Sequence, residues 1–282
     1  MKNLCITLLI GLFCGPQTTF SQEYPFEVTV YGSGEPILFV PGFSCPGEVW
    51  ETTVETLRKE YELHVFTLAG FGGVKPVDFP WLPQIKKGME NYIRDKGLQK
   101  PKFVGHSMGG TLGLWLAADN PMMFSKVISV DGLPAMGALM FPDYNPSDFG
   151  YDTPYNQQAL AMTDEQFMGM AAQFANGMTL REEKKPQIVE WMEKADRKTY
   201  LYGYTDLLKL DLRKALGRIR TPVTVFAATE PYGIQTVKNT IENQFGNLQD
   251  YTLILAEDSA HFIMFDRPEW FNGMLIEELT NK

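Results

Sequence analysis

A serine held between two glycines is the residue best placed to do chemistry in this chain. Ser107 lies in the run Gly-His-Ser-Met-Gly at residues 105–109, after the apolar run 102–104 and before the helix-like stretch 111–116. This G-x-S-x-G pattern predicts a tight strand-to-helix turn that lifts the serine Oγ above a sheet. Glycines are needed because the turn presses against its neighbours and leaves no room for a Cβ. The competing interpretation is a glycine-rich turn without chemistry, and the pattern by itself favours neither.

A serine hydroxyl needs a base, which is usually histidine, and the chain has three histidines. His106 is adjacent to Ser107, and neighbouring side chains on a sharp turn diverge. His64 lies within the apolar run 63–68 and is expected to be a hydrogen-bonded core histidine. His261 follows the apolar run 251–255 and a short polar loop, so it can reach a nucleophile on a neighbouring strand. His261 is the candidate base.

The third group must be a carboxylate that orients the imidazole. Glu230 comes just after the apolar run 223–228 and precedes His261 in the chain. Asp131 comes directly after the apolar run 127–130. Both give the chain order serine, acid, histidine. The sequence leaves both open, with Glu230 slightly preferred.

Acyl transfer also needs backbone N–H groups directed at the developing oxyanion. The N–H of Met108, directly after the serine, is one candidate. The strand-like run 37–40 ends in Pro41-Gly42, and the N–H of Phe43 is the expected second donor, ahead of Ser44.

In these segments the chain resembles the α/β-hydrolases. The matching pieces are VPGF at 40–43, VGHSMGG at 104–110, the acids at strand ends and AHFIMFDRPE at 260–269, in family order. The resemblance implies that Ser107 is the nucleophile, His261 the base, and Phe43 and Met108 the oxyanion donors. Two departures are a proline at 41, where many members have histidine, and AATE at 227–230 in place of G-x-x-D. Some members take their acid from the earlier strand, which keeps Asp131 as a candidate.

Strand and helix patterns alternate along the chain, which predicts an α/β fold with a mainly parallel sheet and helices on both faces. The expected strands are 37–40, 64–68, 102–104, 127–130, 223–227 and 252–255, and the expected helices include 50–61, 84–96, 235–245 and 269–279.

The alternation stops between Gly132 and Arg220, where helical stretches and Pro/Gly-rich loops predict a lid or cap insertion at about 133–218 in the domain 22–282. Seven of the 14 methionines fall in this insertion. We expect more than half of its methionines and phenylalanines to form its own core, and the rest to form a pliable apolar roof. Such a roof favours acyl or aryl groups over sugars or charged peptides.

The first 21 residues are typical of a secretory signal, with Lys2, an apolar run at 4–13 and a small-x-small site before Gln22. The apolar run is too short for a stable membrane span, and a lipoprotein signal ending at Cys14 is the alternative. The mature chain would keep only Cys45, which excludes an intramolecular disulfide and suits an exported bacterial protein, periplasmic or secreted. Cys45 is expected to be a buried structural thiol.

The net charge of −9, without a basic run, argues against nucleic acid and anionic membranes as partners. The leading hypothesis is a serine hydrolase that cleaves a small to medium, apolar carboxylic ester through an acyl-enzyme, without cofactor or metal. A C–C bond hydrolase or haloperoxidase-like member of the same fold and a non-catalytic ligand-binding protein are the alternatives. The histidines lack the spacing of a metal hydrolase. The sequence does not specify an oligomeric state.

Overall fold

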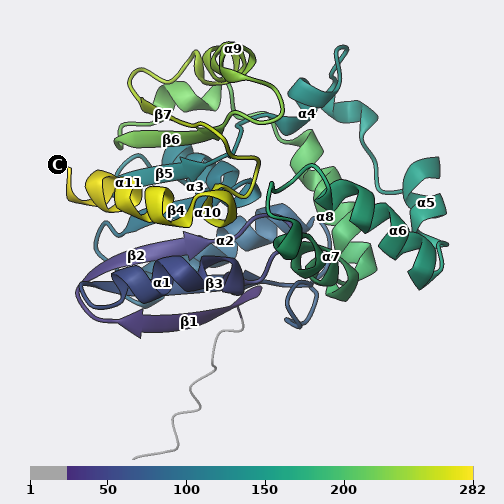
Figure 1. Cartoon of the computed structure of the whole chain (residues 1–282), viewed down its shortest axis with the longest axis horizontal. Coiled ribbons are helices and arrows are strands. Elements are labelled where there is room, and N and C mark those ends of the chain that lie inside the picture. Colours follow the sequence, from purple (N-terminus) through teal and green to yellow (C-terminus); the bar gives the residue numbers. More distant parts are fainter. Residues whose placement is uncertain (1–23, 282) are drawn as a thin grey trace, which may run out of the picture.

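A seven-stranded sheet forms the centre of the computed structural model, which describes residues 24–281 (Figure 1). The strand order is β1-β3-β2-β4-β5-β6-β7, and only β1 runs antiparallel to its neighbour, β3. The other neighbouring strands pair in parallel. The strands are β1 (Phe26–Gly32), β2 (Glu35–Val40), β3 (Tyr61–Leu68), β4 (Lys102–His106), β5 (Lys126–Val130), β6 (Val223–Ala228) and β7 (Thr252–Ala256).

The central parallel strands are apolar along almost their whole length because both faces of the sheet are covered. In β2, Leu38 and Val40 face one core cluster, whereas Ile37 and Phe39 face the other. The first cluster is covered by helices α2 (Trp81–Asp95), α3 (Met108–Asp119) and α9 (Ile234–Phe245). The second is covered by α1 (Glu51–Leu57) and α11 (Pro268–Thr280), which lie in front of the sheet in Figure 1. The prediction of a mainly parallel sheet between two helical layers is confirmed.

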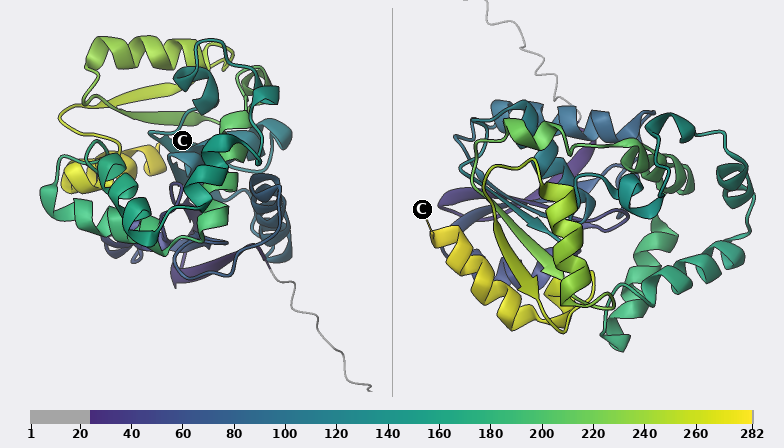
Figure 2. Two further views of the ribbon diagram at one scale, coloured as in Figure 1. Left: turned by 90° about the vertical axis from the view of Figure 1, so that its right-hand side faces the viewer. Right: turned by 90° about the horizontal axis from the view of Figure 1, so that it is seen from above.

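Between β5 and β6 the chain forms helices without a strand, and residues 131–222 are called the helical insertion below. Most of the insertion lies beside the sheet, next to the carboxyl ends of the parallel strands (Figures 1 and 2). Its α-helices are α4 (Met136–Met140), α5 (Pro154–Leu160), α6 (Asp164–Ala175), α7 (Lys185–Lys194) and α8 (Arg197–Lys209). Short 3-10 turns are η2 (Pro146–Asp148), η3 (Glu182–Lys184) and η4 (Ala215–Arg218).

Three local expectations differ from the structure. Strand β1 was not expected, and it exists through its pairing with β3. The helix expected at 50–61 is shorter, because residues 47–50 form the 3-10 turn η1 (Gly47–Trp50) and Tyr61 already pairs with Glu35 in the sheet. The helix expected from residue 84 begins at Trp81, because the Asp206 carboxylate accepts hydrogen bonds from the N–H groups of Trp81 and Leu82.

The predicted signal segment, residues 1–21, lies outside the described residues, so cleavage and export stay predictions. Among residues 24–281, no helix combines the length and apolar character that crossing a bilayer requires. The short helix α10 (Ile263–Asp266) follows the loop that carries His261.

Candidate active site

Ser107 sits on the predicted turn between β4 and α3, in a backbone conformation with φ of 54° and ψ of −121°. A positive φ is unfavourable for a residue with a Cβ, so surrounding bonds must hold it. The Ser107 N–H donates to the Val130 carbonyl at 2.8 Å, which fixes the turn against β5. A Cβ added to Gly105 would lie 2.3 Å from the Gly109 backbone, and one on Gly109 would lie 2.4 Å from the Val40 carbonyl oxygen. The predicted need for both glycines is confirmed.

His261 and Asp131 are joined by a short polar contact at this edge of the sheet. The His261 Nδ1 lies 2.6 Å from Asp131 Oδ2, and both side chains are about three-quarters buried. Asp131 itself has a φ of 51°. Its N–H donates to the Phe226 carbonyl, and its Oδ1 accepts from the Ala228 N–H, so β6 fixes the carboxylate. Because Nδ1 donates to the carboxylate, a neutral His261 carries its lone pair on Nε2.

Glu230, the acid slightly preferred from sequence, does not occupy this position. It meets the histidine loop through its backbone, whose N–H donates to the Ser259 carbonyl at 3.0 Å. Within residues 24–281 its carboxylate makes neither a hydrogen bond nor an ion pair. The order of preference between the two acids is therefore reversed, because β5 ends beside the nucleophile turn and directs Asp131 at the imidazole.

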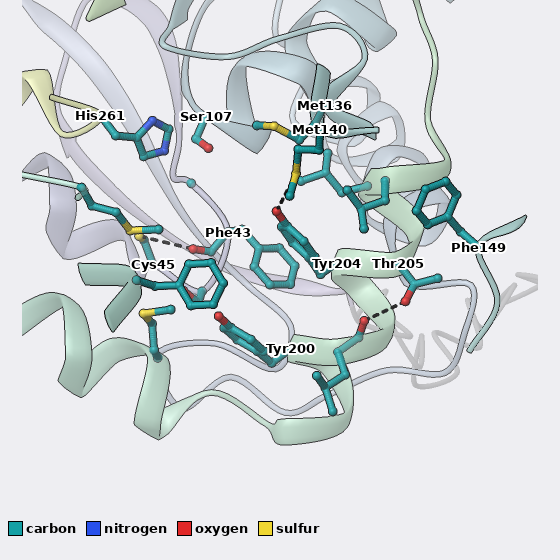
Figure 3. A pocket seen from close by; sticks show the side chains of 18 of the residues that line it. Phe43, Cys45, Ser107, Met136, Met140, Phe149, Tyr200, Tyr204, Thr205 and His261 are labelled. Carbon is teal, nitrogen blue, oxygen red and sulfur yellow. Dashed lines mark hydrogen bonds between the residues drawn. The ribbon is translucent and has the colours of Figure 1, made fainter. Parts of the chain in front are cut away.

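The Ser107 hydroxyl and the His261 ring both line one pocket and are drawn at the same end of it in Figure 3. Within the described part of the chain the hydroxyl makes no hydrogen bond. Such contacts are often long without substrate and shorten in the reacting complex. The geometry therefore brings the two groups together without joining them by a hydrogen bond.

The candidate oxyanion donors are both available. Neither the Phe43 nor the Met108 N–H donates to another group among residues 24–281. The loop that carries Phe43 packs closely on the serine turn: a Cβ on Gly42 would lie 2.8 Å from His106 Nδ1 and 3.2 Å from Ser107 Cβ. Glycine at position 42 thus allows the close approach that two converging N–H donors require.

His106 has a role that the sequence did not reveal. Its ring is fully buried, and its Nε2–H donates to the backbone carbonyl of His261 at 3.0 Å. The two imidazole rings pack with centroids 4.6 Å apart. The pKa of His106 is held well below its ordinary value, mainly by burial and to a smaller extent by the charge of the nearby His261. A neutral His106 therefore links the serine turn to the histidine loop.

Asp266 is a second residue that sequence reasoning missed. Its buried carboxylate accepts from the Ala260 N–H at 2.7 Å and from the Leu180 N–H at 2.9 Å. The Phe262 N–H donates to the Met178 carbonyl. These bonds attach the histidine loop to the helical insertion, and the DRP sequence after the histidine gave no indication of that contact.

The remaining polar residues singled out from sequence are structural. His64 is buried, with Nδ1 2.7 Å from the Tyr92 hydroxyl and Nε2 2.9 Å from Glu62 Oε1. Burial raises the pKa of the Cys45 thiol, which donates to the Phe43 carbonyl. The expectations of a core histidine and a buried structural thiol are confirmed.

A pocket of about 500 Å³ lies between the serine turn and the helical insertion (Figure 3). Four of the seven insertion methionines line it, namely Met136, Met140, Met178 and Met192. Phe141, Phe149 and Phe174 add aromatic surface. No aspartate, glutamate, lysine or arginine is among the described residues that line the pocket. The site therefore suits an uncharged, mainly apolar group next to Ser107.

Comparison with known proteins places these features in a family context. Residues 37–274 match the model of the alpha/beta hydrolase family. The chain is 25% identical over 257 residues to a pimeloyl-[acyl-carrier protein] methyl ester esterase of Vibrio cholerae, an alignment that covers 89% of this chain and 96% of that protein.

Solved structures with the same fold include an esterase from Exiguobacterium antarcticum, with a TM-score of 0.76 and 16% identity. The superposition covers 91% of this chain and 96% of the esterase. A bromoperoxidase from Bacillus anthracis gives a TM-score of 0.73 at 19% identity, covering 91% of this chain and 95% of the peroxidase. These likenesses establish the fold and leave the reaction to be argued from the site.

Proposed function

Since the chain belongs to the alpha/beta hydrolase family, we propose that it is a serine hydrolase that cleaves a small to medium, apolar carboxylic ester through an acyl-enzyme. The observation that carries this proposal is the 2.6 Å contact between His261 Nδ1 and the Asp131 carboxylate, beside the strained turn of Ser107. The Vibrio cholerae relative is named for the hydrolysis of a methyl ester, which supports an ester hydrolase as the class of enzyme.

In the proposed reaction, Ser107 Oγ attacks the ester carbonyl carbon while His261 Nε2 takes its proton. The carbonyl oxygen becomes an oxyanion that accepts hydrogen bonds from the Phe43 and Met108 N–H groups. His261 then returns the proton to the leaving alkoxide, and the alcohol departs from the acyl-enzyme. Water, deprotonated by the same imidazole, attacks the acyl carbon, and the acid is released with the proton restored to Ser107.

Asp131 serves in this mechanism as the acid that holds His261 in one tautomer and stabilises its charged form. The Asp131 carboxylate is suited to that role because its other oxygen is already bonded to the Ala228 N–H, which limits its rotation. Glu230 is assigned no chemical step. The apolar lining of the pocket supports an apolar acyl or alkoxy group, and the helical insertion would act as the lid over it.

Labelling with a fluorophosphonate tests the proposal, because only an activated serine attacks the phosphorus. The wild type should bind one equivalent of probe, which peptide mass mapping should assign to Ser107. Ser107→Ala should lose the label and at least about a thousandfold in ester hydrolysis. Ser125→Ala, which removes an exposed hydroxyl, is the matched control and should behave as the wild type. Equal hydrolysis by wild type and Ser107→Ala would instead favour a binding protein.

A further inference from the structure

Tyr200 and Tyr204, both on helix α8, line the pocket and carry hydroxyl groups. Two other polar side chains in its wall are already bonded: Asn156 donates to Thr205 and to two backbone carbonyls, and Thr205 donates to the Leu201 carbonyl. Within residues 24–281, the Tyr200 hydroxyl makes no hydrogen bond. The Tyr204 hydroxyl reaches only the Met140 sulfur, at 3.5 Å, and a thioether is a weak acceptor.

Helix α8 places these two hydroxyls on the same side, because residues four apart share a helix face. Their rings flank the Phe43 ring, with centroid distances of 5.5 Å for Tyr200 and 5.4 Å for Tyr204. Figure 3 shows both side chains among the pocket-lining residues, with the Tyr204 hydroxyl directed at Met140. The pair therefore lies in the same pocket as Ser107 and His261.

The chemistry of the pair defines what it can recognise. Burial raises the pKa of both hydroxyls, so each remains a protonated donor at neutral pH. A phenol in an apolar wall binds a carbonyl, ether or hydroxyl oxygen well. A carboxylate would be desolvated there without a cation, since the described lining residues include neither lysine nor arginine.

We propose that Tyr200 and Tyr204 form a polar subsite for an uncharged oxygen carried on the apolar part of the substrate. The substrate class is then a neutral ester with a second hydrogen-bond acceptor, rather than a plain hydrocarbon ester or a half-ester of a dicarboxylic acid. This inference rests on the proposed function and deepens it.

The test compares ethyl octanoate, ethyl octanoates with an oxo group at successive inner carbons, and monoethyl octanedioate. In the wild type, kcat/KM for the best oxo ester should exceed that for ethyl octanoate by about fivefold to twentyfold, as expected for one or two hydrogen bonds in an apolar site. The charged half-ester should be the poorest substrate. Tyr200→Phe and Tyr204→Phe should each reduce the ratio of kcat/KM for the best oxo ester to kcat/KM for ethyl octanoate.

Tyr202→Phe is the matched control, because Tyr202 lies on the same helix but packs on Phe79 and Tyr151 instead of lining the pocket. It should keep the oxo preference. An unchanged preference in both Tyr200→Phe and Tyr204→Phe, or a preference for the charged half-ester, would overturn the subsite.

Binding separates this inference from the proposed function. Calorimetry with Ser107→Ala should show tighter binding of the oxo ester than of ethyl octanoate, and Ser107→Ala/Tyr200→Phe should lose that difference. Failure of hydrolysis and labelling with this binding difference intact would overturn the function alone. Hydrolysis of all esters with no binding difference would overturn the subsite alone.

Discussion

At the scale of single residues, two strained positions adjoin each other across the sheet. Ser107 and Asp131 both have positive φ, and each follows the end of a parallel strand. Positive φ costs free energy for residues other than glycine and persists where neighbouring bonds fix it. The Ser107 N–H donates to β5, and the Asp131 N–H donates to β6. The proposed nucleophile and acid are therefore positioned by the sheet and not by flexible loops.

Exchanging the two strand-end acids for amides tests which one acts. Asp131→Asn should lower kcat by about a thousandfold to ten-thousandfold, because an amide neither stabilises imidazolium nor selects the required tautomer. Glu230→Gln is the matched variant and should stay within about twofold of the wild type, because the Glu230 carboxylate has no hydrogen-bond or ion-pair partner among residues 24–281. Steady-state hydrolysis of one ester by all three proteins decides this, and a larger loss in Glu230→Gln would contradict the assignment.

At the scale of elements, helix α8 performs two tasks for the site. Its Tyr200 and Tyr204 face the pocket, and its Asp206 lies at the start of α2. The first residue before α2 is Pro80, whose side chain makes no capping hydrogen bond. Asp206 Oδ2 instead accepts from the Trp81 N–H at 2.6 Å and the Leu82 N–H at 3.1 Å, and Oδ1 accepts from the Tyr151 hydroxyl. A carboxylate at a helix N-terminus thus joins the insertion to the core domain.

Removing this cap should weaken the whole fold and the pocket wall together. Asp206→Ala leaves two N–H groups of α2 and the Tyr151 hydroxyl without their acceptor, so we expect a loss of about 1–3 kcal/mol in the free energy of unfolding. Denaturant unfolding measures it. Asp250→Ala, at an exposed position, is the control and should change the free energy by less than about 0.5 kcal/mol. An equal effect of the two substitutions would mean that the cap does not stabilise the protein.

At the scale of the whole molecule, the site joins four segments that are distant in the chain. The Phe43 loop, the serine turn, Asp131 and the His261 loop all follow the carboxyl ends of parallel strands, where α/β folds place their ligands. The His261 loop is fixed by His106 from the sheet and by Asp266 through its bond to the insertion. Its position therefore depends on both the core domain and the insertion.

The buried His106 should make the stability of the folded protein depend on pH. Its pKa is lowered in the folded protein, whereas the unfolded chain titrates near the ordinary value of about 6.5. As the pH falls below that value, His106 becomes protonated in the unfolded state but stays neutral in the folded state. The free energy of unfolding therefore falls by up to about 1.4 kcal/mol per pH unit.

Urea unfolding of wild type and His106→Gln between about pH 7.5 and 5 isolates this contribution. Glutamine does not titrate and still offers an N–H for the His261 carbonyl. The difference in unfolding free energy between the two proteins should therefore shrink as the pH falls. A difference that is constant with pH would show that His106 is not held neutral by the fold.

Local sequence patterns were sufficient for much of this picture. The serine turn was predictable because its glycines, the preceding strand and the following helix are neighbours in the chain. His261 followed from the elimination of two other histidines, and His64 proved to be the expected core histidine. The alternation of strands and helices also predicted the layered sheet. Each of these inferences depends on the local sequence around single residues or on the pattern within single helices and strands.

Other features depend on which strands become neighbours, and a linear pattern does not record that. Strand β1 forms only through its antiparallel partner β3, and the choice between Asp131 and Glu230 depends on which strand end faces the imidazole. In the sequence, the acids that follow β5 and β6 look equivalent, because each comes after an apolar strand. In the folded sheet these strands lie about 4.8 Å apart, and that displacement decides which carboxylate contacts the His261 ring. The cap from Asp206, the His106 bond and the paired tyrosines likewise come from packing between distant segments. The sequence alone therefore determined the chemical groups and the fold class, and only the tertiary structure decided how those groups are paired.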